Sequence, residues 1–329
     1  METLIIFFIF VLIIGLCIGS FLNVVILRAL SEESIVFPAS KCPKCQTPLK
    51  WWHNIPVLSY IMLRGKCAFC KEKISIQYPI IELFTGIIFV LIFLKFQFTL
   101  NTIFFWIYAS LLIVIAGTDI KEKVVFDKHT YSLIGAGLVL GLIKTIIAYI
   151  NYNNLPSNIH YLTFWDNPLT QAIIGALAGA IIMELLARLG YIFAGTRAFG
   201  EGDSYIAAGL GAVFGWQNLL IVLLYSVIIQ IIIFIPLFLY GLIKNKDYKT
   251  LISFLVFIVY AGIFYLLQIK NLINNEYIGI IGAIILALLG IISCKFIFAG
   301  LKNNPETRTY MPFGPAMVLS ALIAIMLIP

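Results

Sequence analysis

Charged side chains are scarce in this chain of 329 residues. Asp, Glu, Lys and Arg make up 11% of it, whereas 62% of the residues are hydrophobic and the mean hydropathy is +1.04. A soluble fold needs more polar side chains to cover its surface, so this composition excludes an ordinary soluble domain. A bilayer-spanning helix takes about 20 mostly apolar residues, and several stretches reach that length without an internal charge. We therefore expect an all-α polytopic membrane protein.

The N-terminus lacks the features of a cleaved signal peptide. Residues 1–30 have no basic start and too long an apolar run, and no small-x-small cleavage site follows. We expect this segment to be retained as the first transmembrane helix. The apolar runs predict about 8–10 transmembrane helices. The candidate spans are roughly 3–27, 79–97, 102–118, 130–149, 169–194, 204–215, 218–243, 251–268, 277–298 and 312–328.

The candidate span 204–215 is short and rich in glycine. It is expected to be a half-buried helix inside the bundle. Glycine lets helix backbones approach closely in membranes. Close helix contacts are therefore expected at the glycines of this region and of the preceding span, which are Gly175, Gly179, Gly209, Gly211 and Gly215.

The basic residues lie between the apolar spans, so the net charge of +7 indicates topology rather than nucleic acid binding. If the N-terminus lies outside, every Lys and Arg except Lys95, Lys144 and Lys270 falls toward the inner side. Inner loops of membrane proteins carry an excess of basic residues. This distribution predicts an external N-terminus and a cytoplasmic loop over 31–78.

That polar loop contains two Cys-x-x-Cys pairs, Cys42 with Cys45 and Cys67 with Cys70. Four thiolates at this spacing suit one tetrahedral zinc ion, and a cytoplasmic location disfavours the alternative disulfide or redox role. A loop of about 40 residues has little core of its own, so the predicted metal is structural. The remaining cysteines, Cys17 and Cys294, lie in apolar spans and are expected to be packing residues.

Two carboxylates stand at the inner ends of apolar spans. Asp119 ends one span, and Asp203 follows two glycines and opens the next short span. An ionisable group at membrane depth is costly and suggests a function. Two close carboxyl groups can share a proton, so that one activates water and the other polarises a scissile carbonyl. Gly200 and Gly202 would let the backbone of a peptide substrate approach.

The chemistry of these carboxylates also fits roles outside peptide cleavage. Asp203 could simply cap the next helix, whereas Asp119 at a helix C-terminus is disfavoured by the helix dipole. Proton-coupled transporters also use intramembrane carboxylates. A proton-coupled transporter with a structural zinc loop therefore remains the alternative hypothesis.

Several stretches, in order along nearly the whole chain, resemble the type IV prepilin leader peptidase and N-methyltransferase family of GxGD intramembrane aspartyl peptidases. The matching elements are Gly19–Arg28, the paired Cys-x-x-Cys loop, Gln77–Gly86, Asp119 with Asp127, Gly200–Asp203 followed by Gly211–Trp216, and Pro312–Pro315.

This resemblance implies two activities. One is cleavage of the leader peptide of type IV prepilins or pseudopilins, with Asp119 and Asp203 as the catalytic pair. The other is N-methylation of the new N-terminus with S-adenosylmethionine. It also implies zinc on the four loop cysteines and a location in the bacterial cytoplasmic (inner) membrane, with the active site toward the cytoplasm. The expected partners are precursor peptides and membrane lipid, not nucleic acid.

The chain departs from the family pattern at two positions: Phe126 stands where the family usually has Pro, and Tyr205 where it often has Lys. Glu201 adds a third acid beside the pair. A scaffold protein that binds precursors without cleaving them is therefore a further alternative. The expected domains are a first helix over 1–30, the zinc loop over 31–78 with a methyltransferase association, a peptidase core over 79–243, an inserted helical pair over 244–300 and a last helix over 301–329.

Overall fold

The computed structural model forms two compact units, which are described separately. Unit 1 comprises Met1–Ile229 and Pro312–Pro329, and unit 2 comprises Gln230–Met311. The residues that the structure describes are 2–37, 39–150, 165–194, 199–244, 246–269, 281–282, 284–292, 295 and 312–327.

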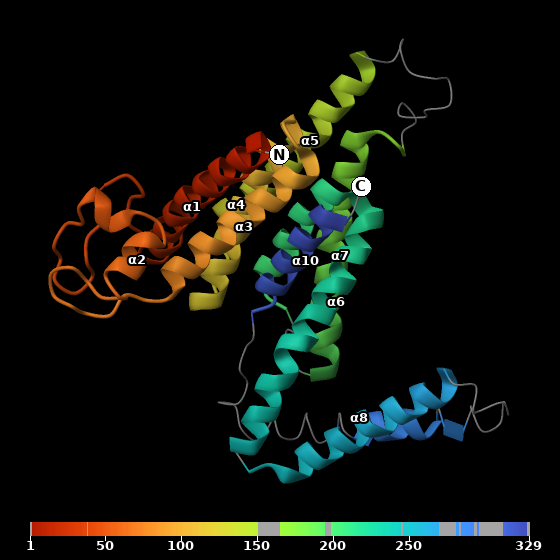
Figure 1. Cartoon of the computed structure of the whole chain (residues 1–329). Coiled ribbons are helices and arrows are strands. Elements are labelled where there is room, and N and C mark those ends of the chain that lie inside the picture. The colour runs from red at the N-terminus through yellow and green to blue at the C-terminus, as the bar shows by residue number, and fades with distance from the viewer. Residues whose placement is uncertain are drawn as a thin grey trace. The chain divides into compact units, whose positions relative to one another are not determined.

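Three long helices from the first part of the chain pack together in unit 1. They are α1 (Glu2–Ser31), α3 (Gln77–Phe96) and α4 (Leu100–Glu122), and Figure 1 shows them side by side. A Cβ on Gly15 would lie 2.7 Å from the Cα of Gly86, so glycine permits the close contact of α1 with α3. The loop between α1 and α3 lies at the end of α1 away from the N-terminus (Figure 1).

The next helices are α5 (Asp127–Ile150), α6 (Pro168–Ala194) and α7 (Glu201–Lys244). α7 consists of two helices that meet at a kink, where Gly215 has the non-helical angles φ 73° and ψ 166°. Its first part matches the predicted short span. Most of its side chains from 206 to 212 are buried in the bundle, as expected for an internal helix.

Close backbone contacts join α6 to the first part of α7. A Cβ on Gly175 would collide with the backbone of Gly211, and a Cβ on Gly179 would collide with the backbone of Ala207. The predicted glycine contacts are therefore confirmed between these two helices. The contacts place the short helix deep in the bundle, where it can carry a residue away from lipid and bulk water.

The last helix, α10 (Gly314–Leu327), packs against α4 and completes the core of unit 1. Buried apolar side chains from α4, α5, the first part of α7 and α10 form one cluster. Within it, the Tyr108 hydroxyl donates a hydrogen bond to the backbone oxygen of Gly209 over 3.1 Å. This core ties α4 to α7, the two helices that carry the aspartates singled out by the sequence.

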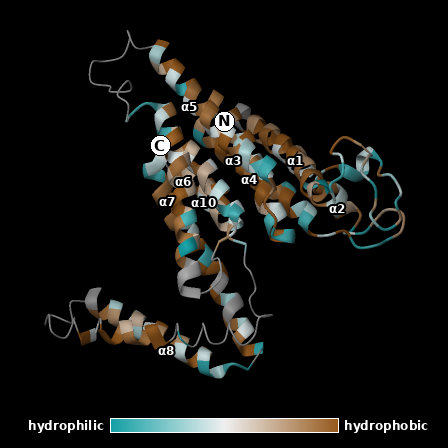
Figure 2. Ribbon diagram, turned by 180° about the vertical axis from the view of Figure 1, so that it is seen from behind, coloured by the Kyte–Doolittle hydropathy of each residue, from teal (hydrophilic) through white to brown (hydrophobic). Residues whose placement is uncertain are grey.

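Many large apolar side chains are exposed on the helices, and Figure 2 shows hydrophobic residues, in brown, along much of the helical ribbons. Seven helices in the described ranges are long and apolar enough to cross a membrane, and α10 is a shorter apolar helix. The prediction of an all-helical polytopic membrane protein is confirmed. One detail is corrected: Cys17 is exposed on α1 rather than packed in a core. Cys294 lies outside the described residues.

Unit 2 contains the C-terminal part of α7 and the whole of α8 (Tyr248–Ile269). Asp247 caps α8, because its carboxylate accepts hydrogen bonds from the backbone and the side chain of Thr250. The Tyr260 hydroxyl donates to the backbone oxygen of Gly282 over 3.3 Å. Unit 2 begins at Gln230, whereas the inserted helical pair was expected to begin at residue 244. Part of the predicted span 277–298 lies outside the described residues.

Candidate functional site

Asp119 lies near the C-terminus of α4 and is only 5% exposed. Its Oδ2 atom is buried and has no hydrogen-bond partner among the described residues. Gly314 of α10 stands directly against that atom, and a Cβ at position 314 would collide with it. A buried carboxyl oxygen without a partner is costly in a folded protein, which favours a functional role over a structural one.

Asp203 lies in the first turn of α7 and is 8% exposed. Its Oδ2 atom accepts a hydrogen bond of 3.0 Å from the backbone N–H of Gly200. This is the half of a capping box in which an acid in the first turn reaches back to the start of the helix. The helix-capping interpretation is thus correct for one carboxylate oxygen. The same bond fixes the direction of the carboxyl group.

The structure brings Asp119 and Asp203 into one site. The Asp119 carboxylate lies close enough to interact electrostatically with Asp203. Gly314 of α10 lies close to the helices that carry both aspartates. A Cβ on Gly314 would meet the Asp119 carboxylate and also Ile206, which lies in α7 one turn beyond Asp203. The C-terminal end of α4 and the N-terminal ends of α7 and α10 therefore meet around two buried carboxyl groups. Such a pair can hold one proton between them and act as acid and base on a peptide bond.

The two glycines before Asp203 have different surroundings. Among the described residues, a Cβ on Gly200 would meet only the Asp203 carboxylate, at 3.6 Å. A Cβ on Gly202 would lie 2.6 Å from the Cβ of Val125. Gly202 therefore lets the start of α7 pack on the segment between α4 and α5. A role in substrate approach remains a prediction for both.

The two residues that depart from the family pattern make contacts of their own beside the pair. The Phe126 ring contacts the ammonium group of Lys128, 5.3 Å from the ring centroid. The Tyr205 ring packs edge-on against Tyr131 with centroids 5.6 Å apart. Asp127, the second acid of the first motif, is exposed at the start of α5 rather than enclosed with the pair. Both rings contact α5 side chains, and neither departure removes a carboxylate from the aspartate site.

The loop between α1 and α3 brings the four predicted cysteine ligands together. The Sγ atoms of Cys42, Cys45, Cys67 and Cys70 all lie within 4.8 Å of one another. Cys42 and Cys67 are buried, so the cluster is partly shielded from solvent. Four thiols at this spacing can hold one metal ion in tetrahedral coordination.

The two cysteine pairs are held by the same local structure, repeated along the loop. The Cys42 N–H donates to the Thr47 oxygen and the Gln46 N–H to the Cys42 oxygen, and the second pair makes the equivalent bonds. The residue after each pair has positive φ, 57° at Gln46 and 61° at Lys71. Each turn thereby points its thiols toward the cluster.

Hydrogen bonds in the loop favour the thiolate form of two of the four cysteines, Cys45 and Cys67, whereas burial and the neighbouring thiols raise the pKa of Cys70 to about 11. Bonds from the side chain and the backbone of Thr47 lower the pKa of the Cys45 thiol to about 6. Backbone bonds from Cys70 and Phe69 lower the pKa of Cys67. A lower thiol pKa raises the fraction of thiolate, which is the metal ligand.

A buried polar cluster joins the cysteine loop to the membrane helices, and the sequence did not reveal its full extent. Glu82 is 6% exposed and accepts a hydrogen bond of 2.7 Å from the N–H of Val57 in the loop. Val57 has φ 59°, a strained angle for a β-branched residue. Asn23 of α1 donates to the Tyr78 oxygen at the start of α3 over 3.1 Å and so links these two helices. Only the polarity of Asn23 and Glu82 near helix ends signalled this cluster.

Comparison with known proteins gives an independent result. A model described as the bacterial peptidase A24 N-terminal domain matches residues 13–96, and one described as the type IV leader peptidase family matches residues 106–235. A prepilin leader peptidase/N-methyltransferase of Neisseria gonorrhoeae is 33% identical over 67% of this chain and 78% of its own. This chain belongs to the type IV leader peptidase family.

Other leader peptidase/N-methyltransferases agree with that assignment. The one from Klebsiella pneumoniae is 34% identical over 64% of this chain and 86% of its own length. The one from Myxococcus xanthus is 34% identical over 67% of this chain, and the match covers 60% of that longer protein. No solved structure matches the chain. The leader peptidase match covers both aspartates, and it does not support the transporter alternative.

Proposed function

We propose that this member of the leader peptidase family cleaves the leader peptide of a type IV prepilin or pseudopilin with Asp119 and Asp203. The observation that carries the proposal is the meeting of these two buried carboxyl groups from α4 and α7. The ionised carboxylate takes a proton from water, and the protonated one donates to the scissile carbonyl oxygen. Water adds to the carbonyl carbon, and the proton passes to the leaving amine as the peptide bond breaks.

The proposed site lies at the cytoplasmic face of the bacterial inner membrane. The charge distribution supports this orientation, because Lys121, Lys123 and Lys128 flank Asp119 and its neighbouring loop. A short basic leader would be held on the same side by the same rule. The leader junction would then lie next to the inner ends of α4 and α7.

The proposed second activity is N-methylation of the new N-terminus with S-adenosylmethionine as methyl donor. The names of the matched relatives support it. The cysteine loop is proposed to hold a structural zinc ion on Cys42, Cys45, Cys67 and Cys70. The zinc ion would stabilise the loop, and the Glu82–Val57 hydrogen bond would hold it on α3.

Co-expression with a candidate prepilin tests the peptidase, with the mass of the pilin N-terminus as the readout. Cleavage removes the leader, and methylation replaces one hydrogen on the new N-terminal amine by a methyl group, a net gain of CH2 in mass. Asp119→Asn and Asp203→Asn should each reduce cleavage at least about 100-fold, because each removes a general acid or base. Full processing by either variant would end the proposal.

Glu122→Gln is the matched control. Glu122 lies on the same helix as Asp119, one turn further on, and is exposed. Its substitution should leave cleavage unchanged, while detergent extraction and thermal unfolding check that all variants fold. The same experiment distinguishes the peptidase from the scaffold alternative. If the protein is a scaffold, the wild-type chain binds the precursor but leaves its leader uncut.

A further inference from the structure

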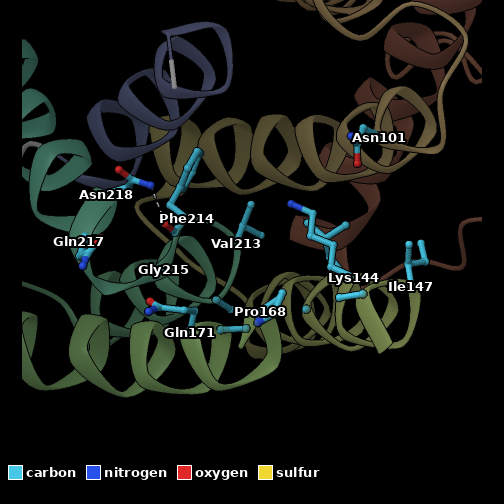
Figure 3. Close-up of a pocket in the computed structure, with 15 residues that line it drawn as sticks. Asn101, Lys144, Ile147, Pro168, Gln171, Val213, Phe214, Gly215, Gln217 and Asn218 are labelled. Atoms are coloured by element: carbon cyan, nitrogen blue, oxygen red, sulfur yellow. Dashed lines mark hydrogen bonds between the residues drawn. The ribbon is translucent and has the colours of Figure 1, made fainter. Parts of the chain in front are cut away.

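A cavity of about 700 Å³ lies between α4, α5, α6 and α7 of unit 1, and Figure 3 shows the side chains around it. It lies at the opposite end of the bundle from the aspartates. Asn101 lines it at the start of α4, whereas Asp119 is near the end of that helix. At about 1.5 Å per residue, the helix separates these two residues by roughly 27 Å. The cavity is therefore distinct from the peptidase site.

The described residues that line this cavity include one charged side chain, Lys144 of α5. Four amide side chains accompany it: Asn101, Gln171, Gln217 and Asn218. In Figure 3 the Lys144 side chain extends from α5 into the space between α4 and α7. Among the described lining residues there is no carboxylate. The cavity thus offers a positive charge and amide groups to a ligand, and two of the amides, Asn218 and Gln171, also donate to the backbone oxygens of Phe214 and Trp165.

Lys144 has no ion-pair partner in the part of the chain that the structure describes. The segment between α5 and α6, residues 151–167, contains one acid, Asp166, and the described residues show no ion pair between Asp166 and Lys144. A lysine within a transmembrane helix is costly unless an anion or polar groups satisfy it. The nearby lysine at the same end of the bundle is satisfied differently, because Lys95 donates to the backbone oxygens of Ile325 and Met326.

The rest of the lining is largely apolar. Ile147 and Leu140 of α5 and Phe214 of α7 are part of it, next to the kink at Gly215. A Cβ at Gly215 would lie 3.2 Å from the Oε1 atom of Gln171, so glycine keeps this wall close to α6. A charged group surrounded by amides and flanked by apolar side chains suits a ligand with an anionic head and a hydrocarbon tail.

We propose that this cavity binds an anionic phospholipid. The lipid phosphate would lie against Lys144 and the amide side chains, and an acyl chain would follow the apolar lining out to the bilayer. The phosphate of such a lipid is a phosphodiester with one negative charge. A free phosphate ion could also pair with Lys144, but it has no acyl chain to contact the apolar lining. The proposal depends on the membrane-spanning fold and not on the peptidase activity.

Native mass spectrometry of the full-length protein, released from nanodiscs, measures retained lipid directly. Phosphatidylglycerol should remain bound, and phosphatidylcholine should be retained less. Lys144→Gln should weaken phosphatidylglycerol retention about fivefold, the effect of one basic residue at an anionic membrane surface. Lys144→Arg should restore retention, because it keeps the positive charge.

Lys95→Gln is the matched control, since it removes an equal charge at the same end of the bundle but outside the cavity. It should leave lipid retention unchanged. Ile147→Trp is a second variant that keeps the charge and narrows the opening, because 45% of the Ile147 surface is exposed and this residue lines the cavity. Ile147→Trp should also lower phosphatidylglycerol retention. Because this variant keeps the charge of Lys144, a loss of retention indicates a lipid site in the cavity rather than a general attraction between charges.

Three results would overturn the proposal. Equal retention of the two lipids would show that no anion is selected. Full phosphatidylglycerol retention by both Lys144→Gln and Ile147→Trp would show that the lipid binds elsewhere. Displacement of the lipid by inorganic phosphate at millimolar concentration would indicate a site for small anions instead.

Discussion

Among single residues, Asp203 both caps a helix and lies beside Asp119, two placements that the sequence presented as alternatives. One carboxylate oxygen caps the start of α7 through Gly200, and the group as a whole lies within electrostatic range of Asp119. The cap therefore orients the carboxyl group rather than competing with its chemistry. Pre-oriented groups lose less freedom when the substrate binds, which is one source of catalytic rate.

Gly314 is a residue whose substitution should affect catalysis without removing a carboxylate. Gly314→Ala should reduce cleavage about 10- to 100-fold, because its methyl group collides with Asp119 Oδ2 and displaces that carboxyl group. Cleavage of a co-expressed prepilin, followed over time, measures the effect. Gly135→Ala is the control, since a Cβ there meets nothing within 4 Å. Equal rates for both variants would mean that Gly314 does not set the Asp119 geometry.

At the scale of elements, the short first part of α7 differs from an ordinary transmembrane helix. It ends at the Gly215 kink and is surrounded by α5, α6 and α10. At its glycine contacts with α6, the backbones of the two helices pack directly on each other without side chains between them. A helix enclosed in this way can hold Asp203 at one end and contribute to the lipid cavity at the other.

The cysteine loop is the second element with a testable property. The purified protein should contain one zinc ion per chain, and Cys42→Ser combined with Cys45→Ser should remove it, because only two thiolate ligands remain. Metal analysis measures the zinc, and limited proteolysis should show faster cleavage within 31–78. Cys17→Ser is the control, since this exposed cysteine lies on α1 outside the cluster. Unchanged zinc content in the double variant would refute the four-cysteine site.

At the scale of the whole molecule, the fold of unit 1 gathers polar groups at opposite ends of the bundle. Asp119 and Asp203 lie at one end, and Lys95 and Lys144 lie toward the other. The basic loop residues lie at the aspartate end, as the charge distribution requires. The two ends are therefore expected to face different compartments and different lipid leaflets.

Reporter fusions test this orientation. A fluorescent protein fused after Lys123 should be active, because that position is expected in the cytoplasm. Alkaline phosphatase fused after Phe98, between α3 and α4, should be active, because that position is expected outside. Exchanging the two reporters is the control and should abolish both signals. Alkaline phosphatase activity at Lys123 would reverse the proposed orientation of the peptidase site.

The sequence by itself identified most of the apolar helices, the four clustered cysteines and the two aspartates. These features are local, because the length of an apolar run, the spacing of Cys42 and Cys45, or a carboxylate at the end of a span can be recognised without knowing what packs nearby. The short span before Gly215 was also visible, from its length and its glycines. Family resemblance then added roles that residue chemistry alone had left open.

Only the tertiary structure decided how distant residues meet. It placed Gly314 in contact with Asp119 and Val125 in contact with Gly202. It also brought the Val57 N–H into a hydrogen bond with the Glu82 carboxylate. It also formed an open cavity lined by Lys144, which the sequence identified only as a basic residue on the outer side. Such pairings depend on how helices cross and on which faces they turn toward one another. Apolar membrane helices are hydrophobic on all sides, so their composition does not specify those faces.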